Sequence, residues 1–189
     1  YALVGASGGG KTTIARILAK ALNCEKGVSS HPCGECSACR GVDEGRFPDY
    51  LEMDAASNRK VEEMAVVLEN AAYLPTVGRY KVFVIDEVHM LSTHAFNAML
   101  KTLEEPPPHV IFVLATTDPQ KVPVTVLSRC MQFGLRNVSP ATVAGHLANV
   151  LQAEDIPYEE RGLELIGKAA GGSMRDGGCS ESGPKNLAL

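Results

Sequence analysis

The stretch Gly-Ala-Ser-Gly-Gly-Gly-Lys-Thr at residues 5–12 has two glycines separated by four residues and followed by Lys and Thr. Apolar residues 1–4 precede it, and from residue 12 to residue 22 apolar side chains recur with helical spacing. A glycine-rich loop between a strand and a helix turns backbone N–H groups inward, and the positive end of the helix attracts an anion. The stretch therefore predicts a phosphate-binding loop rather than a glycine-rich turn without a ligand.

Residues in and just after this loop are the candidates for holding a nucleotide. Lys11 is expected to bind the β- and γ-phosphates, and the Thr12 hydroxyl is expected to coordinate Mg²⁺. Because Mg²⁺ keeps several water ligands, it needs few protein groups besides phosphate. The expected nucleotide-contacting residues are Gly5, Gly8, Gly10, Lys11, Thr12 and Thr13.

An acidic pair that follows a second apolar run completes the expected site. Residues 80–85 are rich in β-branched and aromatic residues, and Asp86 and Glu87 follow them. Such a strand would bring the pair to the carboxyl edge of a sheet, where ligands bind. We expect Asp86 in the magnesium shell and Glu87 as the general base that orients the attacking water. The alternative is a solvated acidic pair at a strand end, and the apolar run before the pair argues against it.

Strand-like runs and helical periodicity alternate along the chain. Residues 50–53, 80–85 and 110–116 predict strands, and helices are expected over residues 61–72 and after the N-cap residue Ser92. Strands that alternate with helices at this spacing indicate βαβ crossovers. The predicted fold class is α/β, with a parallel sheet covered by helices on both faces.

The pattern changes along the chain and suggests three parts. We expect a core over residues 1–137, a small helical domain over 138–176 whose first helix starts near Ser139, and a tail over 177–189. The core contains an insertion at residues 24–39, which is poor in large apolar residues. The tail combines Gly, Ser and Pro in a pattern unsuited to a helix and is expected to be artificial or disordered.

Four cysteines in the insertion have metal-like spacing. Eight, two and two residues separate Cys24, Cys33, Cys36 and Cys39, so the chain can present four thiolates to one tetrahedral ion. Zinc is the expected metal, in a structural site with no open position. An iron–sulfur cluster is the alternative, but no Cys-Pro follows Cys39 as in the usual ferredoxin run. Disulfides would require an oxidising compartment.

Composition restricts the function classes. The chain has 189 residues, 45% hydrophobic and 21% charged, with a formal net charge of −4. Without a dense basic face, strong sequence-independent binding of nucleic acid by this chain alone is not expected. No apolar run approaches the roughly 20 residues needed to cross a bilayer. We therefore expect a cytoplasmic protein with no membrane role.

Several motifs together resemble one family. They are Asp-Glu-Val-His-Met-Leu at 86–91, Leu-Lys-Thr-Leu-Glu-Glu-Pro-Pro at 100–107, Ala-Thr-Thr-Asp-Pro-Gln-Lys at 115–121 and Ser-Arg-Cys at 128–130. Over residues 1–176 the chain resembles the γ/τ clamp-loader subunits of bacterial DNA polymerase III, which are AAA+ ATPases. The family's zinc module agrees with the cysteine spacing.

The resemblance implies roles for three further residues. Thr117 corresponds to the polar sensor 1 residue that helps to place the water, with Thr116 as the less favoured candidate. Arg129 corresponds to the arginine that enters the ATP site of a neighbouring subunit, although a surface arginine in a local ion pair is the plain alternative. Arg175 corresponds to the sensor 2 arginine of the helical lid, which touches ATP within the same subunit.

The resemblance also implies a function and partners. We expect an ATP- and Mg²⁺-dependent motor within a DNA-directed DNA polymerase holoenzyme, which loads the sliding clamp onto primer–template DNA together with sister subunits in a hetero-oligomer. The family continues upstream of Tyr1 and downstream into a collar domain. A nucleotide-gated scaffold with negligible turnover is therefore the alternative, and an unrelated zinc-containing P-loop ATPase is a third reading.

Overall fold

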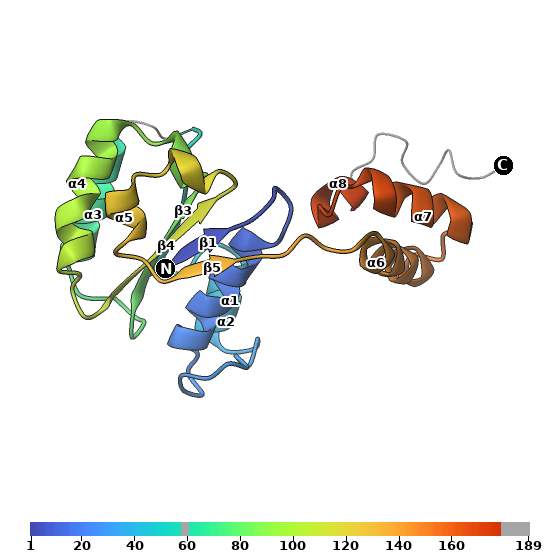
Figure 1. Ribbon diagram of the computed structural model, residues 1–189. Helices are drawn as coiled ribbons and strands as arrows, with labels where there is room; N and C mark the ends of the chain where they lie inside the picture. Colours follow the sequence, from blue (N-terminus) through green and yellow to red (C-terminus); the bar gives the residue numbers. More distant parts are fainter. Residues whose placement is uncertain (58–60, 179–189) are drawn as a thin grey trace. The chain divides into compact units, whose positions relative to one another are not determined.

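The computed structural model describes residues 1–57 and 61–178, and the chain divides into two compact units (Figure 1). The first unit contains residues 1–4 and 11–134. The second contains residues 5–10 and the chain from Leu135 onward. The predicted tail from Cys179 onward lies outside the described residues.

A parallel sheet forms the centre of the first unit. Its five strands are arranged in the order β2-β3-β4-β1-β5, and each neighbouring pair is parallel. The register places Asp86 of β3 opposite Asp54 of β2. The predicted α/β class with a parallel sheet is confirmed. The strands are β1 (Ala2–Val4), β2 (Tyr50–Asp54), β3 (Lys81–Asp86), β4 (Val110–Thr116) and β5 (Gln132–Gly134).

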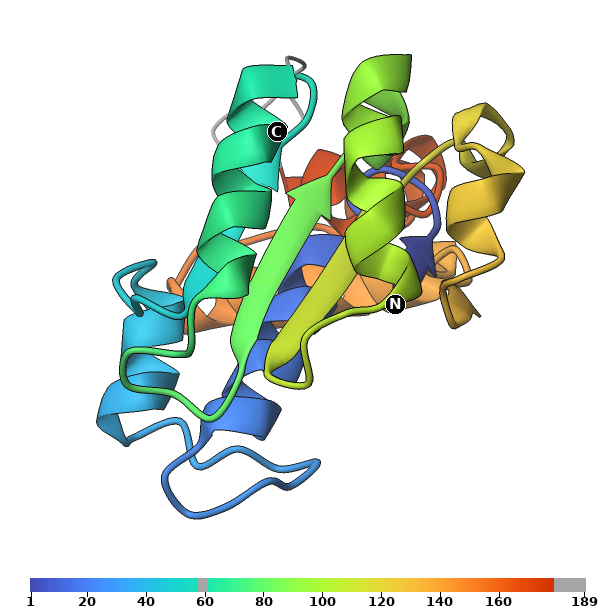
Figure 2. The ribbon, with the colours of Figure 1, turned by 90° about the vertical axis from the view of Figure 1, so that its left-hand side faces the viewer.

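Helices cover both faces of this sheet, because successive side chains of a strand point to opposite faces. Phe83 and Ile85 of β3 pack in one hydrophobic cluster with residues of α3 and α4. Val82 and Val84 pack in the other cluster with residues of α1 and α2. Figure 2 shows α3 and α4 side by side over one face of the sheet. The helices are α1 (Lys11–Asn23), α2 (Ser37–Asp43), α3 (Val61–Ala72), α4 (Thr93–Glu104) and α5 (Val124–Leu127).

Capping explains where α4 begins. The side chain of Ser92 accepts a hydrogen bond from the backbone N–H of Ala95 at 3.2 Å, as the sequence predicts. Two short 3-10 turns, η1 (Val88–Met90) and η2 (Pro119–Lys121), follow β3 and β4. Both turns therefore lie at the carboxyl edge of the sheet, where the candidate site residues were expected.

The second unit is helical beyond residue 135, with α6 (Pro140–Ala153), α7 (Glu160–Ala169) and α8 (Met174–Gly178). Ser139 caps α6 by accepting from the N–H of Thr142 at 3.1 Å. Helices α6 and α7 approach closely, since a Cβ atom at Gly167 would lie 2.4 Å from the carbonyl oxygen of Pro140. Only glycine fits there without a shift of the backbone.

The expectation that residues from Gly177 onward do not suit a helix is wrong for the first two of them. Gly177 and Gly178 form the end of α8. Gly177 is buried, and a Cβ atom there would lie 2.7 Å from Val143 of α6. Tight packing against α6 thus outweighs the low intrinsic helix propensity of glycine.

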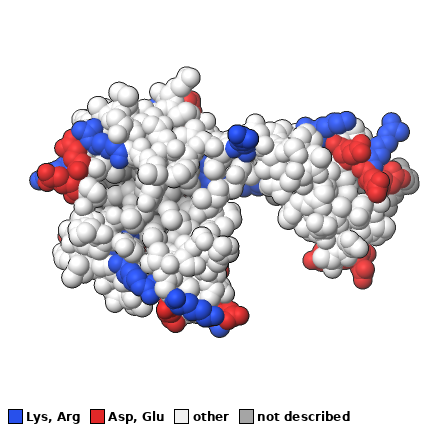
Figure 3. All heavy atoms as spheres, turned by 60° about the horizontal axis from the view of Figure 1, so that its bottom comes forward, with Lys and Arg blue, Asp and Glu red and all other residues white. Residues whose placement is uncertain are grey.

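The distribution of surface charge and the length of the apolar helices agree with the composition of the chain. On the face shown in Figure 3, basic and acidic side chains lie beside one another in each unit, without a block of one sign. Among the described residues, no helix is both long and apolar enough to cross a membrane.

Candidate nucleotide site and metal centre

The hydroxyl and the carboxylate expected to share Mg²⁺ lie next to each other. Helix α1 begins at Lys11, directly after the glycine loop, and Asp86 is the last residue of β3. Thr12 Oγ1 donates a hydrogen bond to Asp86 Oδ2 at 2.8 Å. The other oxygen, Asp86 Oδ1, accepts from the backbone N–H of Glu87 at 2.9 Å. Oxygen ligands of this kind suit Mg²⁺.

Glu87 lies where β3 turns into η1. Its φ of 46° is in the left-handed region, which non-glycine residues adopt at some cost and which is common at functional sites. Thr117, just after β4, donates from Oγ1 to Glu87 Oε2 at 2.9 Å. The carboxyl ends of the adjacent parallel strands β3 and β4 therefore supply the acid and its hydroxyl partner.

Thr116 and Thr117 have different environments. Thr117 is exposed, and its hydroxyl contacts Glu87. Thr116 is buried, and its Oγ1 accepts from the N–H of Asp118 and lies 3.0 Å from His89 Nδ1. His89 was not predicted as a site residue, although it lies in the motif at residues 86–91.

The glycine loop, residues 5–10, belongs to the second unit. Gly8 and Gly10 have φ values of 66° and 86°, and the loop is closed by a hydrogen bond from Gly9 N to Ala6 O. A Cβ atom at Gly8 would lie 2.0 Å from Ser173 Oγ, whereas one at Gly10 would meet nothing within 4 Å. The positive φ values at both positions are of the kind that glycine adopts readily.

The remaining expected nucleotide-contacting residues differ in exposure. The Lys11 side chain is buried, with 5% of the residue exposed. Thr13 is exposed on α1, and Arg175 is exposed on α8. In the second unit, the backbone N–H of Met174, beside Arg175, donates to Gly8 O at 3.2 Å. The start of α8 and the glycine loop are therefore joined within this unit.

Arg129 makes a local ion pair. Its guanidinium binds the carboxylate of Glu104 at the end of α4 and donates to the carbonyl oxygen of Thr125. Both ion-pair partners are partly exposed, with side-chain exposures of 32% and 50%. Surface pairs of this kind contribute little to stability, so Arg129 can exchange Glu104 for another anion.

The four predicted metal ligands lie together. Among the described residues, Cys24, Cys33, Cys36 and Cys39 form a group whose sulfur atoms all lie within 4.8 Å of one another. Tetrahedral zinc with bonds of about 2.3 Å holds its sulfur ligands roughly 3.8 Å apart, so a zinc ion fits with small adjustments. His31, the histidine of the insertion, is not in this group, and its Nδ1 lies 2.9 Å from Ser30 Oγ.

The thiols of this group differ in acidity. Backbone N–H groups of Glu35 and Cys36 lower the pKa of Cys33 to about 6. Burial raises the pKa of Cys39 to about 12, so this thiol gives up its proton only to a strong partner such as a metal ion. The insertion is not isolated, because Cys39, Ala38 and Val42 are buried and α2 packs in the hydrophobic cluster that contains Val82 and Val84.

Two solved structures share the fold of this chain. The RuvB Holliday junction branch migration motor of Thermotoga maritima is 18% identical, with a TM-score of 0.63 over 94% of this chain and 51% of that one. A DNA polymerase III gamma subunit-related protein of the same organism is also 18% identical, with a TM-score of 0.52 over 90% of this chain and 53% of that one. At these identities the likeness establishes the fold alone. That fold is of the α/β class with a parallel sheet.

Sequence comparison narrows the class to a family. A model described as "DNA polymerase III, delta subunit" matches residues 1–139, and one described as "DNA polymerase III clamp loader subunit, ATPase lid domain" matches residues 142–177. The tau/gamma subunit of DNA polymerase III from Haemophilus influenzae and the tau subunit from Escherichia coli are each 56% identical over 93% of the chain. The chain belongs to the family of γ/τ clamp-loader subunits of DNA polymerase III. It spans 26% and 27% of these two relatives.

Proposed function

We propose that this chain binds ATP with Mg²⁺ and hydrolyses it, as the motor part of a clamp loader that opens the sliding clamp and loads it onto primed DNA. The proposal rests on four side chains that meet in two hydrogen-bonded pairs at the carboxyl edge of the sheet. Thr12 contacts Asp86, and Glu87 is held by Thr117. A magnesium ligand pair and a candidate base are thus arranged beside the helix that follows the phosphate loop.

In the proposed reaction, Lys11 and the loop N–H groups bind the phosphates, and Thr12 and Asp86 hold the magnesium ion. That ion, when bound, neutralises charge on the β- and γ-phosphates. Glu87 orients a water molecule and accepts its proton as the water oxygen bonds to the γ-phosphorus. The bond from that phosphorus to the bridging oxygen breaks, and the electron pair leaves with ADP.

The proposed partners of this chain are based on its family and on the surroundings of Arg129. The guanidinium, held by Glu104 in this chain, would move to the γ-phosphate bound by a neighbouring subunit and stabilise the transferred phosphoryl group. Sister subunits, the sliding clamp and primer–template DNA are the proposed partners. Arg175 would touch ATP in the same subunit and couple the nucleotide to the lid.

We assign the cysteine cluster a structural zinc ion. Four thiolates leave no open coordination position, so the ion would order the insertion and would take no part in the hydrolysis. Helix α2 carries Cys39 and packs in the hydrophobic cluster that contains Val82 and Val84. The ion would therefore stabilise the phosphate-loop side of the sheet as well as the insertion.

The test is ATP hydrolysis by the full-length subunit, alone and with sister subunits, clamp and primed DNA. Glu87→Gln removes the base, and Glu69→Gln, at an exposed position on α3, is the matched control. We expect stimulation by clamp and DNA that disappears in Glu87→Gln only. ATP binding without stimulated turnover in the wild type would contradict the motor and favour the nucleotide-gated scaffold.

A further inference from the structure

His89 lies beside the candidate base in a way that the proposed reaction does not yet use. The turn η1 folds the chain back after Glu87, so that His89 Nδ1 lies 3.3 Å from Glu87 Oε2. The same nitrogen lies 3.0 Å from Thr116 Oγ1 at the end of β4. Only 10% of the His89 side chain is exposed, compared with 29% for Glu87. A nearly buried imidazole thus bridges the end of β4 and the carboxylate.

The neighbours of Nδ1 select one tautomer. An ionised carboxylate only accepts hydrogen bonds, so a lone pair on Nδ1 facing Glu87 Oε2 would be repelled. Thr116 Oγ1 already receives the N–H of Asp118 and can accept a second hydrogen bond. A proton on Nδ1 can be donated to Thr116 and places positive charge beside the Glu87 carboxylate, whereas a proton on Nε2 alone leaves the Nδ1 lone pair beside that carboxylate. The Nδ1–H form is therefore favoured.

We propose that His89 is a positioning residue for Glu87: its Nδ1–H, anchored on Thr116, acts with the Thr117 hydroxyl to hold Glu87 Oε2 in place. This inference rests on the proposed function. The Thr117 hydroxyl donates to Glu87 Oε2 at 2.9 Å, and His89 Nδ1 lies 3.3 Å from the same oxygen. The other oxygen, Oε1, is then directed to the water molecule.

Two anchors do more than one for a side chain with several rotatable bonds. With Thr117 alone, the Glu87 carboxylate can still turn about its hydrogen bond, and Oε1 moves away from the water. Small displacements of a reacting group cost much of the rate, because productive alignment is lost. Loss of the Nδ1–H should therefore lower kcat and leave nucleotide binding almost unchanged.

Two substitutions at His89 separate positioning from packing. In His89→Asn the amide N–H₂ stands near the position of Nδ1, whereas in His89→Gln it stands one bond farther out, near Nε2. Glutamine is closer to histidine in size, so a packing role predicts that His89→Gln is the milder change. A positioning role predicts the reverse. His94→Asn, at an exposed position on α4, is the control.

The experiment measures kcat for ATP hydrolysis and ATP affinity in the full-length subunit, assembled with its partner subunits, clamp and primed DNA. We expect kcat to fall about 10- to 100-fold in His89→Ala and His89→Gln, and by less than about threefold in His89→Asn. ATP affinity should stay within about twofold in all three.

Equal kcat values in wild type and His89→Gln, or a larger loss in His89→Asn than in His89→Gln, would overturn the positioning role alone. Wild-type hydrolysis that does not depend on Glu87 would overturn the proposed function and this inference with it. The Glu87→Gln variant in the same assay therefore separates the two failures.

Discussion

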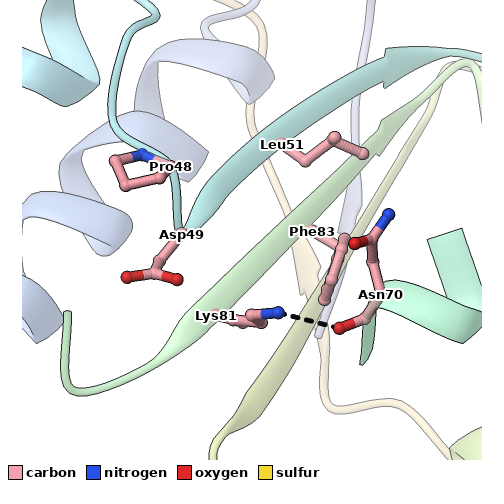
Figure 4. Close-up of a pocket in the computed structure, with 6 residues that line it drawn as sticks. All are labelled: Pro48, Asp49, Leu51, Asn70, Lys81 and Phe83. Atoms are coloured by element: carbon pink, nitrogen blue, oxygen red, sulfur yellow. Dashed lines mark hydrogen bonds between the residues drawn. The ribbon is translucent and has the colours of Figure 1, made fainter. Parts of the chain in front are cut away.

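Charged residues lie both at the amino edge of the sheet, where its strands begin, and at the carboxyl edge, where they end. The two groups of residues differ in their hydrogen-bond partners. At the amino edge, Asp49 precedes β2 and accepts from the backbone N–H groups of three residues, Thr76, Val77 and Gly78. Lys81, at the start of β3, donates to the carbonyl oxygen of Asn70 across a small pocket (Figure 4). These charges are buried and bound to the protein itself.

At the carboxyl edge the polar groups bind one another through side chains and remain partly open to solvent. Asp86 and Glu87 are half-buried, and their partners are the hydroxyls of Thr12 and Thr117. A hydroxyl and a carboxylate can exchange such a contact for a metal ion or a water molecule. Full satisfaction by backbone groups therefore marks a structural charge, and replaceable side-chain contacts mark the candidate functional one.

Substitution of Arg129 is expected to have the largest effect on ATP hydrolysis. Arg129 is also an exception to the difference between the two edges. It lies with Val110, the first residue of β4, in a pocket at the amino edge, yet its partner Glu104 is replaceable. We expect Arg129→Ala to lower kcat of the assembled complex by about 10³-fold, because the transferred phosphoryl group loses its stabilising cation. ATP binding to the isolated subunit should stay unchanged. Loss of that binding would argue against a role in the neighbouring site.

Removal of the proposed zinc ion tests whether the cysteine cluster is structural, as the amino edge of the sheet is. Cys39→Ser replaces a buried thiolate ligand with a hydroxyl that binds zinc poorly. We expect loss of bound metal, measured by elemental analysis, and a lower melting temperature, because α2 loses its anchor. Cys130→Ser, outside the cluster, is the control. Iron with sulfide, or undiminished metal in Cys39→Ser, would contradict the assignment.

Asp49 carries a smaller effect, on stability and its pH dependence. Burial alone would raise the pKa of Asp49, but the N–H groups of Gly78, Thr76 and Val77 and the charge of Lys81 outweigh it, and the pKa lies below its usual value of 3.8. The charged form therefore stabilises the fold above about pH 4, and this contribution is lost as the pH falls through the lowered pKa.

In urea unfolding, Asp49→Asn should cost about 2 kcal/mol at pH 7, because an amide cannot accept three N–H donors as a carboxylate does. The difference from wild type should shrink as the pH falls below about 4. A difference that stays constant down to pH 2 would show that the charge of Asp49 does not stabilise this edge.

Sequence patterns predicted β1 to β4 and missed β5. β3 and β4 lie between two hydrophobic clusters, so nearly every residue is apolar and the run is visible in the sequence. β5 (Gln132–Gly134) is exposed throughout and too short to show a periodicity, and it was not predicted. The short helix α5 was missed for the same reason of length.

The candidate site shows the same division. Asp86 and Glu87 could be identified because they end a buried strand, and the cysteines because their spacing matches a metal site. His89 and Glu104 could not, because their contacts with Thr116 and Arg129 join residues 27 and 25 positions apart. A local pattern carries no signal for such contacts.

Within one subunit, we infer that the carboxyl edge of the sheet is catalytic and that the amino edge is structural. The most direct measurement compares Glu87→Gln with Asp49→Asn in the full-length subunit, each by ATP hydrolysis in the assembled complex and by urea unfolding of the subunit. We predict that Glu87→Gln lowers hydrolysis by about 100-fold or more and changes the unfolding free energy by less than about 0.5 kcal/mol, whereas Asp49→Asn is destabilised with nearly normal hydrolysis per folded molecule. Loss of both properties in both variants, or normal hydrolysis in Glu87→Gln, would contradict it.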